Sequence, residues 1–156
     1  MTPPAVDPLI DAVLRASRAL VGVAARSITG VADDVTVPQY RALVVLASHG
    51  PQGMAGLASE LGVSPSTATR MCDRLVRRGL VRRRISNEDR RQVRLALTSD
   101  GLALLEEVTA ARRNEIERIL GSLSRASRRQ LVTSLTAFSE AAGELADEDW
   151  AAGWEL

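Results

Sequence analysis

The fold is decided by the stretch Ser64-Pro65-Ser66-Thr67-Ala68-Thr69-Arg70, which has the form of a helix N-terminus. The Ser64 hydroxyl can cap the first turn by accepting a hydrogen bond from a backbone N–H group, and Pro65 suits the first helical position because no N–H is needed there. We expect this helix to end near Arg78, with Gly79 as its C-cap.

The expected helix has two different faces. At 100° per residue, one face is apolar and carries Ala68, Met71, Cys72, Leu75 and Val76. The opposite face is polar and carries Ser66, Thr67, Arg70, Asp73, Arg74 and Arg77. In isolation, such a pattern would indicate only an amphipathic helix with one solvated face.

The preceding residues change this interpretation. Apolar residues recur at helical spacing through Met54–Leu61, and Gly62-Val63 then forms a tight turn into Ser64. Two short helices joined by a turn that contains glycine are typical of a helix-turn-helix, whose second helix enters the major groove of DNA. Serine and threonine hydroxyls and an arginine guanidinium suit that position, because they can bond both base edges and phosphates.

After Gly79 the hydrophobic period becomes alternating, which predicts two strands at residues 80–85 and 92–97. In the second strand we expect Val93, Leu95 and Leu97 to point inward, and Gln92, Arg94 and Ala96 to point outward. The loop between the strands contains Arg90 and Arg91 next to Asp89. An arginine at such a tip can enter a narrow minor groove while an aspartate holds it in position; the alternative is a surface hairpin with a local ion pair.

Charge favours the nucleic-acid interpretation. Between Ser64 and Leu97 there are ten arginines against three acidic residues, a formal charge of +7, whereas the whole chain carries only +1. A locally basic module in a nearly neutral protein is the electrostatic pattern expected for a protein that binds nucleic acid.

The combined spacing of these motifs resembles that of the MarR family of transcriptional regulators. The resemblance covers about residues 36–105 and is carried by Pro38–Leu43, Gly50-Pro51, Leu57–Arg70, Asp73-Arg74-Leu75, Gly79-Leu80-Val81, Asp89-Arg90-Arg91, Leu97-Thr98 and Gly101. It implies that Ser66, Thr67 and Arg70 face the major groove, that Arg90 or Arg91 reaches the minor groove, and that Asp89 steadies the wing. The full candidate set for the major groove is Ser64, Ser66, Thr67, Arg70, Arg74 and Arg77, and for the wing Arg84, Asp89, Arg90 and Arg91.

The expected fold class is mostly α with a small β component (α+β): a winged helix-turn-helix flanked by terminal helices that form a dimerisation bundle. The length of 156 residues predicts one domain over 1–156, with a DNA-binding region at 36–97 and dimerisation helices at 7–30 and 98–146. Apolar stripes in both flanks either pack within one subunit or pair with a second chain. We favour the second, because these helices extend beyond a compact winged helix. The resemblance likewise implies a homodimer.

Other classes of protein lack support in the sequence. It has no glycine-rich phosphate loop and no credible catalytic set around its one histidine, His49, so we expect neither an enzyme nor a cofactor. His49 also has no neighbour at metal-ligand spacing, and a helix cap is its expected role. The lone Cys72 falls on the packing face, where a buried structural thiol is expected. We expect no membrane insertion and a cytoplasmic location.

Two functions remain open at this point. The first is a dimeric transcription factor, a repressor that binds a pseudo-palindromic operator in double-stranded DNA and responds to a small molecule; the resemblance implies a small aromatic or lipophilic ligand. The second is a winged-helix module that binds an acidic protein partner. The serines, threonine and arginine at the helix start, together with arginine at the wing tip, favour the first function.

Overall fold

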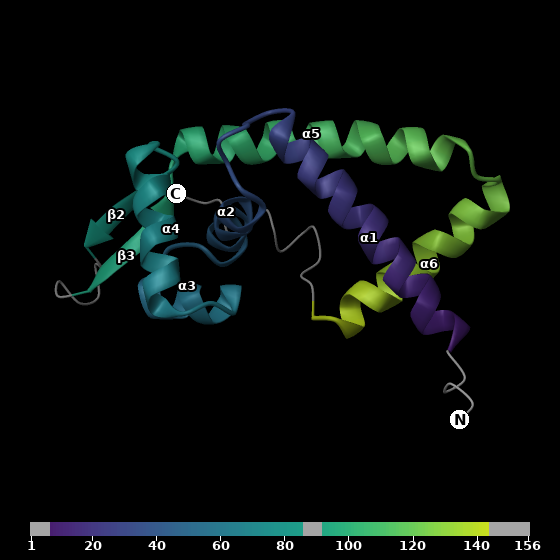
Figure 1. Ribbon diagram of the computed structural model, residues 1–156, viewed down its shortest axis with the longest axis horizontal. Coiled ribbons are helices and arrows are strands. Elements are labelled where there is room, and N and C mark those ends of the chain that lie inside the picture. The colour runs from purple at the N-terminus through teal and green to yellow at the C-terminus, as the bar shows by residue number, and fades with distance from the viewer. Residues whose placement is uncertain (1–6, 86–91, 144–156) are drawn as a thin grey trace, which may run out of the picture.

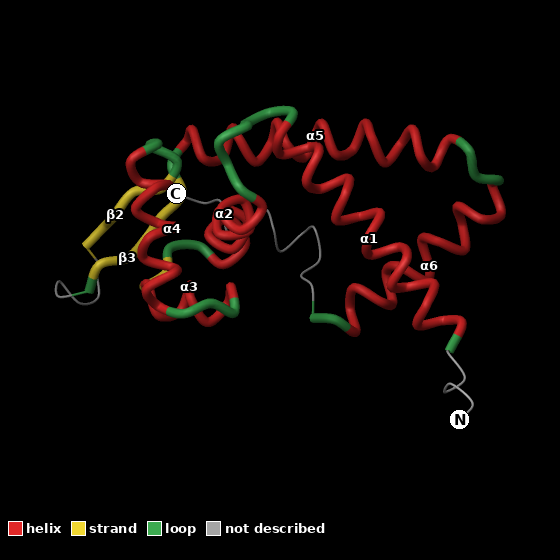
Figure 2. Tube along the Cα trace, viewed as in Figure 1, coloured by secondary structure: helices red, strands yellow, loops and turns green. Residues whose placement is uncertain are grey.

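The computed structural model describes residues 7–85 and 92–143. Within these two ranges, six helices and three short strands follow one another (Figures 1 and 2). They are α1 (Pro8–Thr29), α2 (Val37–His49), β1 (Gln52–Gly53), α3 (Met54–Leu61), α4 (Pro65–Arg77), β2 (Val81–Ile85), β3 (Val93–Leu97), α5 (Ser99–Gly121) and α6 (Arg125–Ala141). The expected fold class, mostly helical with a winged helix-turn-helix, is confirmed.

The helix starts are set by side chains that accept hydrogen bonds from the first turn. Thr36 and Gln39 form a capping box at α2, in which each side chain bonds the backbone N–H of the other residue. Thr98 caps α5 and Ser124 caps α6, the latter by accepting the backbone N–H of Ser127. These local signals explain why the helix starts can be placed from sequence.

The three strands form an antiparallel sheet in the order β1-β3-β2, with Val81 opposite Leu97 and Ile85 opposite Val93. β1 is not expected from the sequence: it has only two residues and exists because Gln52 and Gly53 pair with β3. The strands β2 and β3 are the wing that the alternating pattern predicts.

Two orientations predicted for β3 are wrong. Val93 was expected inside but is 53 % exposed, and Ala96 was expected outside but is 1 % exposed. Val93 lies at the distal end of the hairpin, beyond the helical core, whereas Ala96 lies near its base, where the central strand of the sheet is covered on both faces. Alternation alone does not show where a hairpin leaves the body of a protein.

Helices α2, α3 and α4 and the three strands make up the winged-helix lobe, residues 37–97, which shares one hydrophobic core with the start of α5. The core includes the fully buried side chains of Leu43, Leu57, Leu75, Leu95 and Leu105. Because α2 packs against α3, α4, α5 and β3, it is the helix around which the lobe is assembled.

The remaining helices α1, α5 and α6, here the terminal helices, extend away from the lobe (Figure 1). α5 runs from the base of the wing past α1, and α6 folds back from the far end of α5. The turn between them is held by Arg128, whose guanidinium donates to the carbonyl oxygens of Leu123 at 3.1 Å and Gly121 at 3.2 Å. No described residue of α6 is buried.

Candidate nucleic-acid interface

The start of α4 holds three hydroxyl groups in one hydrogen-bonded cluster. The Ser64 Oγ accepts the backbone N–H of Thr67 at 3.3 Å and donates to the Thr67 Oγ1 at 2.9 Å. The Ser66 hydroxyl lies 3.1 Å from the Ser64 Oγ. Ser64 is therefore the N-cap and Pro65 follows it in the first turn, as predicted, and Ser64 and Ser66 are both exposed.

The two predicted faces of α4 are confirmed. Ala68, Cys72 and Leu75 are buried, while Met71 and Val76 are partly buried beside them. The opposite face exposes the candidate side chains Arg70, Arg74 and Arg77. The ion pairs found within residues 7–85 and 92–143 include none of these three guanidinium groups.

The turn into α4 follows the helix-turn-helix pattern expected from sequence. Gly62 ends α3 in the left-handed conformation, with φ of 64°, a backbone angle that residues other than glycine adopt at a cost. The Val63 N–H then donates to the Ala58 carbonyl oxygen at 3.1 Å. At the other end of α4, Gly79 has φ of 72° and turns the chain into the wing, close to the predicted helix end.

Two ion pairs that the sequence does not predict join α4 and the residue after it to other elements. On α4, the Asp73 carboxylate accepts a hydrogen bond from the guanidinium of Arg83 in β2. At the end of α4, Arg78 Nη2 lies 2.7 Å from Asp34 Oδ1 in the loop between α1 and α2. Asp73 was expected only as one of several polar residues on the exposed face. Its partner lies in another element, and no local spacing identifies it.

The wing presents further arginines. Arg84 is exposed, and it lies directly opposite Arg94 in the β2–β3 register. The other wing candidates, Asp89, Arg90 and Arg91, lie outside the described residues.

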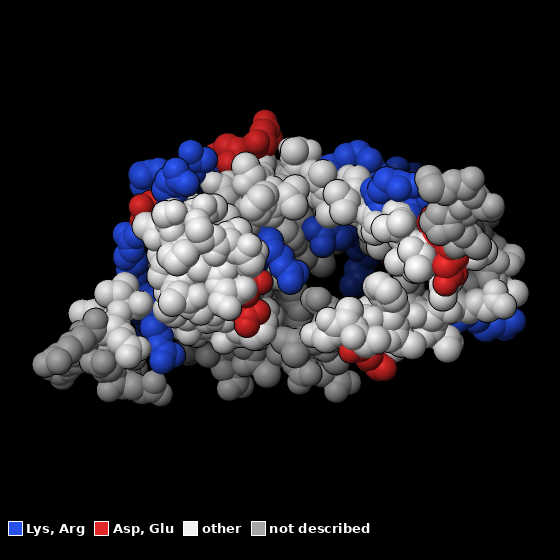
Figure 3. All heavy atoms as spheres, turned by 60° about the horizontal axis from the view of Figure 1, so that its bottom comes forward, with Lys and Arg blue, Asp and Glu red and all other residues white. Residues whose placement is uncertain are grey.

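Basic side chains gather along the outer edge of the winged-helix lobe, where α4 and β2 lie (Figure 3). The exposed arginines in these two elements are Arg70, Arg74, Arg77, Arg82, Arg83 and Arg84. Figure 3 also shows a hollow between the lobe and the terminal helices, with basic side chains in its wall. Much of the local positive charge expected from sequence thus lies on α4 and β2, at one edge of the lobe.

Cys72 is the free thiol behind this surface, and it is fully buried. Burial raises the pKa of the thiol, the neighbouring Asp73 carboxylate raises it further, and Arg83 lowers it to a smaller extent. The predicted role as a buried structural thiol is confirmed, because a thiol held neutral inside a core is a poor nucleophile.

We therefore expect Cys72 to react slowly with a thiol reagent at pH 8 in the folded protein, at a rate at least about tenfold below that in urea. The folded pKa lies above the ordinary value of 9.0, so the unfolded chain loses its proton first and stability should fall as pH rises past that value. Stopped-flow labelling and urea unfolding at several pH values measure both effects. Equal labelling rates with and without urea would show that the thiol is accessible.

Groups that would indicate other chemistry are missing from the described residues. They contain no cluster of three side chains suited to hold a metal ion. The His49 Nδ1 lies 3.3 Å from the Val45 carbonyl oxygen and 3.0 Å from the Ser48 Oγ at the end of α2, the position expected of a helix cap. No helix in the described ranges has the length and apolar character needed to cross a membrane.

Comparisons with known proteins agree on one family. The sequence model of the MarR family matches residues 35–93. An uncharacterized HTH-type transcriptional regulator of Bacillus subtilis, YfiV, is 31 % identical over 108 residues, which cover 69 % of this chain and 68 % of YfiV. The HTH-type transcriptional repressor MdtR of the same organism is 37 % identical over 90 residues, 58 % of each chain. About a third or more of each relative therefore lies outside the match.

A solved structure extends the similarity to nearly the whole chain. The crystal structure of RV1404 from Mycobacterium tuberculosis is 46 % identical, covers 93 % of this chain and 99 % of its own, and superposes with a TM-score of 0.84. The two Bacillus relatives are named as transcriptional regulators, not as enzymes. The motifs, the winged helix and these similarities together show that the chain belongs to the MarR family.

Proposed function

We propose that the chain is a dimeric regulator that binds a specific sequence of double-stranded DNA and represses transcription until a small molecule releases it. The observation that carries the proposal is the surface of α4. A cluster of hydroxyl groups, one of which caps the helix, lies at its start and is followed by exposed arginines on the same face. The name of MdtR as a repressor supports the direction of regulation. Such a protein would work in the cytoplasm, where bacterial DNA is found.

The contacts follow from the position of each side chain on α4. A major groove about 12 Å wide admits one α-helix, with its N-terminal residues toward the bases. In that pose Ser66, Thr67 and Arg70 would meet base edges, and Ser64, Arg74 and Arg77 would meet the phosphates on either side. In the wing, Arg84 would lie along the DNA backbone. Arg90 or Arg91 would reach the minor groove, and Asp89 would hold the arginine in position.

A second copy of the chain is the proposed partner of the terminal helices. Large apolar side chains along α1 and α6 are about half exposed or more in the described part of the chain: Leu9, Ile10, Leu14, Leu20, Val21, Val132, Leu135 and Phe138. Large exposed apolar patches often mark a surface that another protein covers. A twofold dimer would place its recognition helices on half-sites about 34 Å apart, which requires a pseudo-palindromic operator.

The hollow between the winged-helix lobe and the terminal helices is the proposed site of the ligand, an aromatic or lipophilic small molecule (Figure 3). A ligand there would contact both parts of the subunit, so it could favour one spacing of the two recognition helices over another. The alternative, a module that binds an acidic protein, requires positive charge but not the hydroxyl and arginine arrangement of α4, and no observation favours it.

The proposal is tested by a gel shift with the DNA upstream of the protein's own gene, repeated over a range of salt concentrations. Binding to phosphates gives a logarithm of the association constant that falls with the logarithm of salt concentration, by about 0.9 for each phosphate neutralised. A footprint with twofold symmetry would support the dimeric pose. Absence of any shift in dilute buffer would exclude DNA binding.

Arg70 gives the sharpest mutational test of base recognition. If its side chain bonds a base, Arg70→Ala should lower the preference for the operator over random DNA by about 1–3 kcal/mol. The matched control is Arg113→Ala, which removes the same charge from an exposed position in α5. Competition binding separates the outcomes, because equal weakening on all sequences would demote Arg70 to a phosphate contact.

A further inference from the structure

Arg112 lies in α5 where this helix meets both α1 and α2. Its Nε donates a hydrogen bond to the Ser27 Oγ of α1 at 3.4 Å. The same guanidinium lies over the ring of Tyr40 in α2, with its central carbon 5.2 Å from the ring centroid. This side chain of α5 therefore contacts both α1 and α2, beside the core that α1 and α5 share with the lobe.

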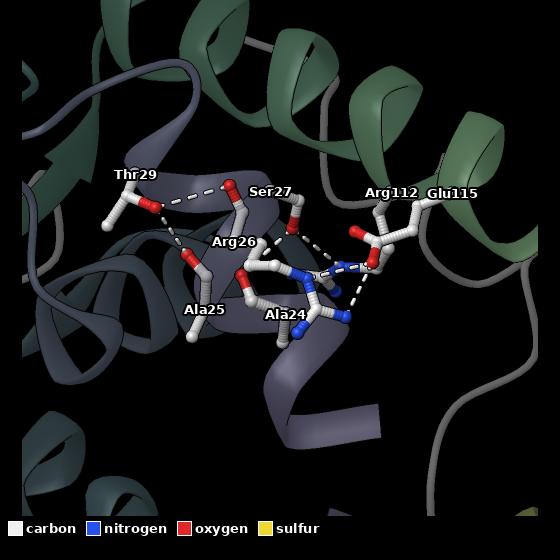
Figure 4. A network of polar contacts seen from close by, with 7 residues as sticks. All are labelled: Ala24, Ala25, Arg26, Ser27, Thr29, Arg112 and Glu115. Carbon is white, nitrogen blue, oxygen red and sulfur yellow. Dashed lines mark hydrogen bonds and ion pairs between the residues drawn. The ribbon is translucent and has the colours of Figure 1, made fainter. Parts of the chain in front are cut away.

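On the α1 side of this junction, Ser27 and Arg26 make further hydrogen bonds (Figure 4). Ser27 is buried, and its hydroxyl donates to the Ala24 carbonyl oxygen at 2.9 Å. One residue earlier, Arg26 donates through Nε at 2.9 Å and through Nη2 at 2.5 Å to the Glu115 Oε1 of α5. The Arg26–Glu115 pair thus joins α1 to α5 through a contact that does not involve Arg112.

The α2 side leads to the recognition helix. Tyr40 is buried in the first turn of α2, where its backbone N–H donates to the Thr36 carbonyl oxygen at 2.9 Å. α2 in turn packs directly against α3 and α4. Because the start of α5 shares the core of the lobe, a change in the contact between Arg112 and the Tyr40 ring would shift α2, and α4 with it, relative to α1 and the far part of α5.

The contacts of the Arg112 guanidinium allow some change of orientation between α5 and its neighbours. Both contacts of Arg112 found within the described chain are with neutral groups, a hydroxyl and an aromatic ring. A guanidinium stacks on a ring face while its N–H groups bond in its own plane, which a lysine ammonium does not do. Stacking holds the distance between α5 and α2 but leaves their angle less restricted than a bidentate ion pair would.

We propose that Arg112, stacked on Tyr40, positions the winged-helix lobe on the α1–α5 pair and so sets the spacing between the two recognition helices of the dimer. The inference rests on the proposed function and names the residue through which the terminal helices act on α4. Arg112 is a positioning residue: it is not expected to touch DNA.

The test compares Arg112→Met, which keeps the aliphatic stem but removes the guanidinium, with Arg113→Met, which removes the same charge from an exposed neighbour. Spin labels on Glu60→Cys, at the exposed end of α3, report the distance between the two lobes without DNA, while the buried Cys72 stays unlabelled. We expect a broader or shifted distance distribution and about tenfold weaker operator binding in Arg112→Met only, with the dimer intact.

Substitutions of the ring provide the second arm. Tyr40→Phe keeps the π face and should behave as wild type, whereas Tyr40→Leu should reproduce Arg112→Met, with no further loss when the two are combined. If Arg112→Met does not fold, Arg112→Lys takes its place and is expected to alter the distances as well. Wild-type distances and affinity in a folded Arg112 variant overturn the proposal. A wild-type protein that binds no DNA refutes the proposed function, yet the label distances still decide the role of Arg112.

Discussion

Replacing Phe138 with glutamate should turn the dimer into monomers and abolish operator binding. Phe138 is 55 % exposed in one subunit and lies on α6 with Leu135 and Val132, which are 49 % and 68 % exposed. In the proposed dimer this stripe is covered by the second copy, so the variant would bury an unpaired carboxylate. Such burial costs several kcal/mol, and we expect the dissociation constant of the dimer to rise by roughly a thousandfold, or about 4 kcal/mol.

Sedimentation velocity at micromolar concentration measures this change directly. The matched control is Ala137→Glu, which introduces the same charge at the neighbouring exposed position but turns it about 100° away from the stripe. The control should remain a dimer and bind DNA. A dimer that persists in Phe138→Glu would show that α6 is not the interface.

Replacing Gly101 with alanine should destabilise the fold by roughly 3 kcal/mol, the upper range for overpacking a core. A Cβ atom at this position would lie 2.2 Å from the Leu80 carbonyl oxygen and 2.9 Å from a methyl group of Leu97. The carbonyl cannot move aside easily, because it accepts the Thr98 N–H at 3.2 Å, and the Thr98 hydroxyl donates to the Gly79 carbonyl oxygen at 2.6 Å.

Thermal unfolding is the measurement, and for a chain of this size the loss corresponds to a fall in Tm of about 6–12 °C. Gly121→Ala in the last turn of the same helix is the control, since nothing lies within 4 Å of its Cβ position. It should leave Tm unchanged or raise it, because alanine is the better helix former. Equal Tm values for the two variants would mean that the chain relaxes around Gly101.

Local signals predicted the parts of the fold that depend on neighbours in sequence. The Ser64 cap, the tight turn at Gly62-Val63 and the two faces of α4 each arise within one or two turns of backbone, so residue type and spacing were sufficient. The roles assigned to individual residues in DNA binding stay predictions, because they depend on the partner.

What the sequence did not predict depends on contacts between distant elements. β1 is a strand only through its pairing with β3, and the Asp73–Arg83 pair joins a helix to a strand that could be placed beside it only in three dimensions. The orientations of Val93 and Ala96 failed for a related reason, since burial depends on how far the hairpin extends from the core. The contacts of Arg112 could not be predicted either, because nothing in the sequence distinguishes it from the other nineteen arginines.

The length of α5 has a mechanical consequence. Its 23 residues form a rod about 34 Å long at 1.5 Å per residue. In the proposed dimer, a tilt of α5 by about 6° at the subunit interface would displace its opposite end by about 3.6 Å, close to the rise of about 3.4 Å for one base pair along DNA. A movement of less than about 1 Å in α5 close to the proposed interface would therefore become a mismatch of about one base pair between the recognition helix and the operator.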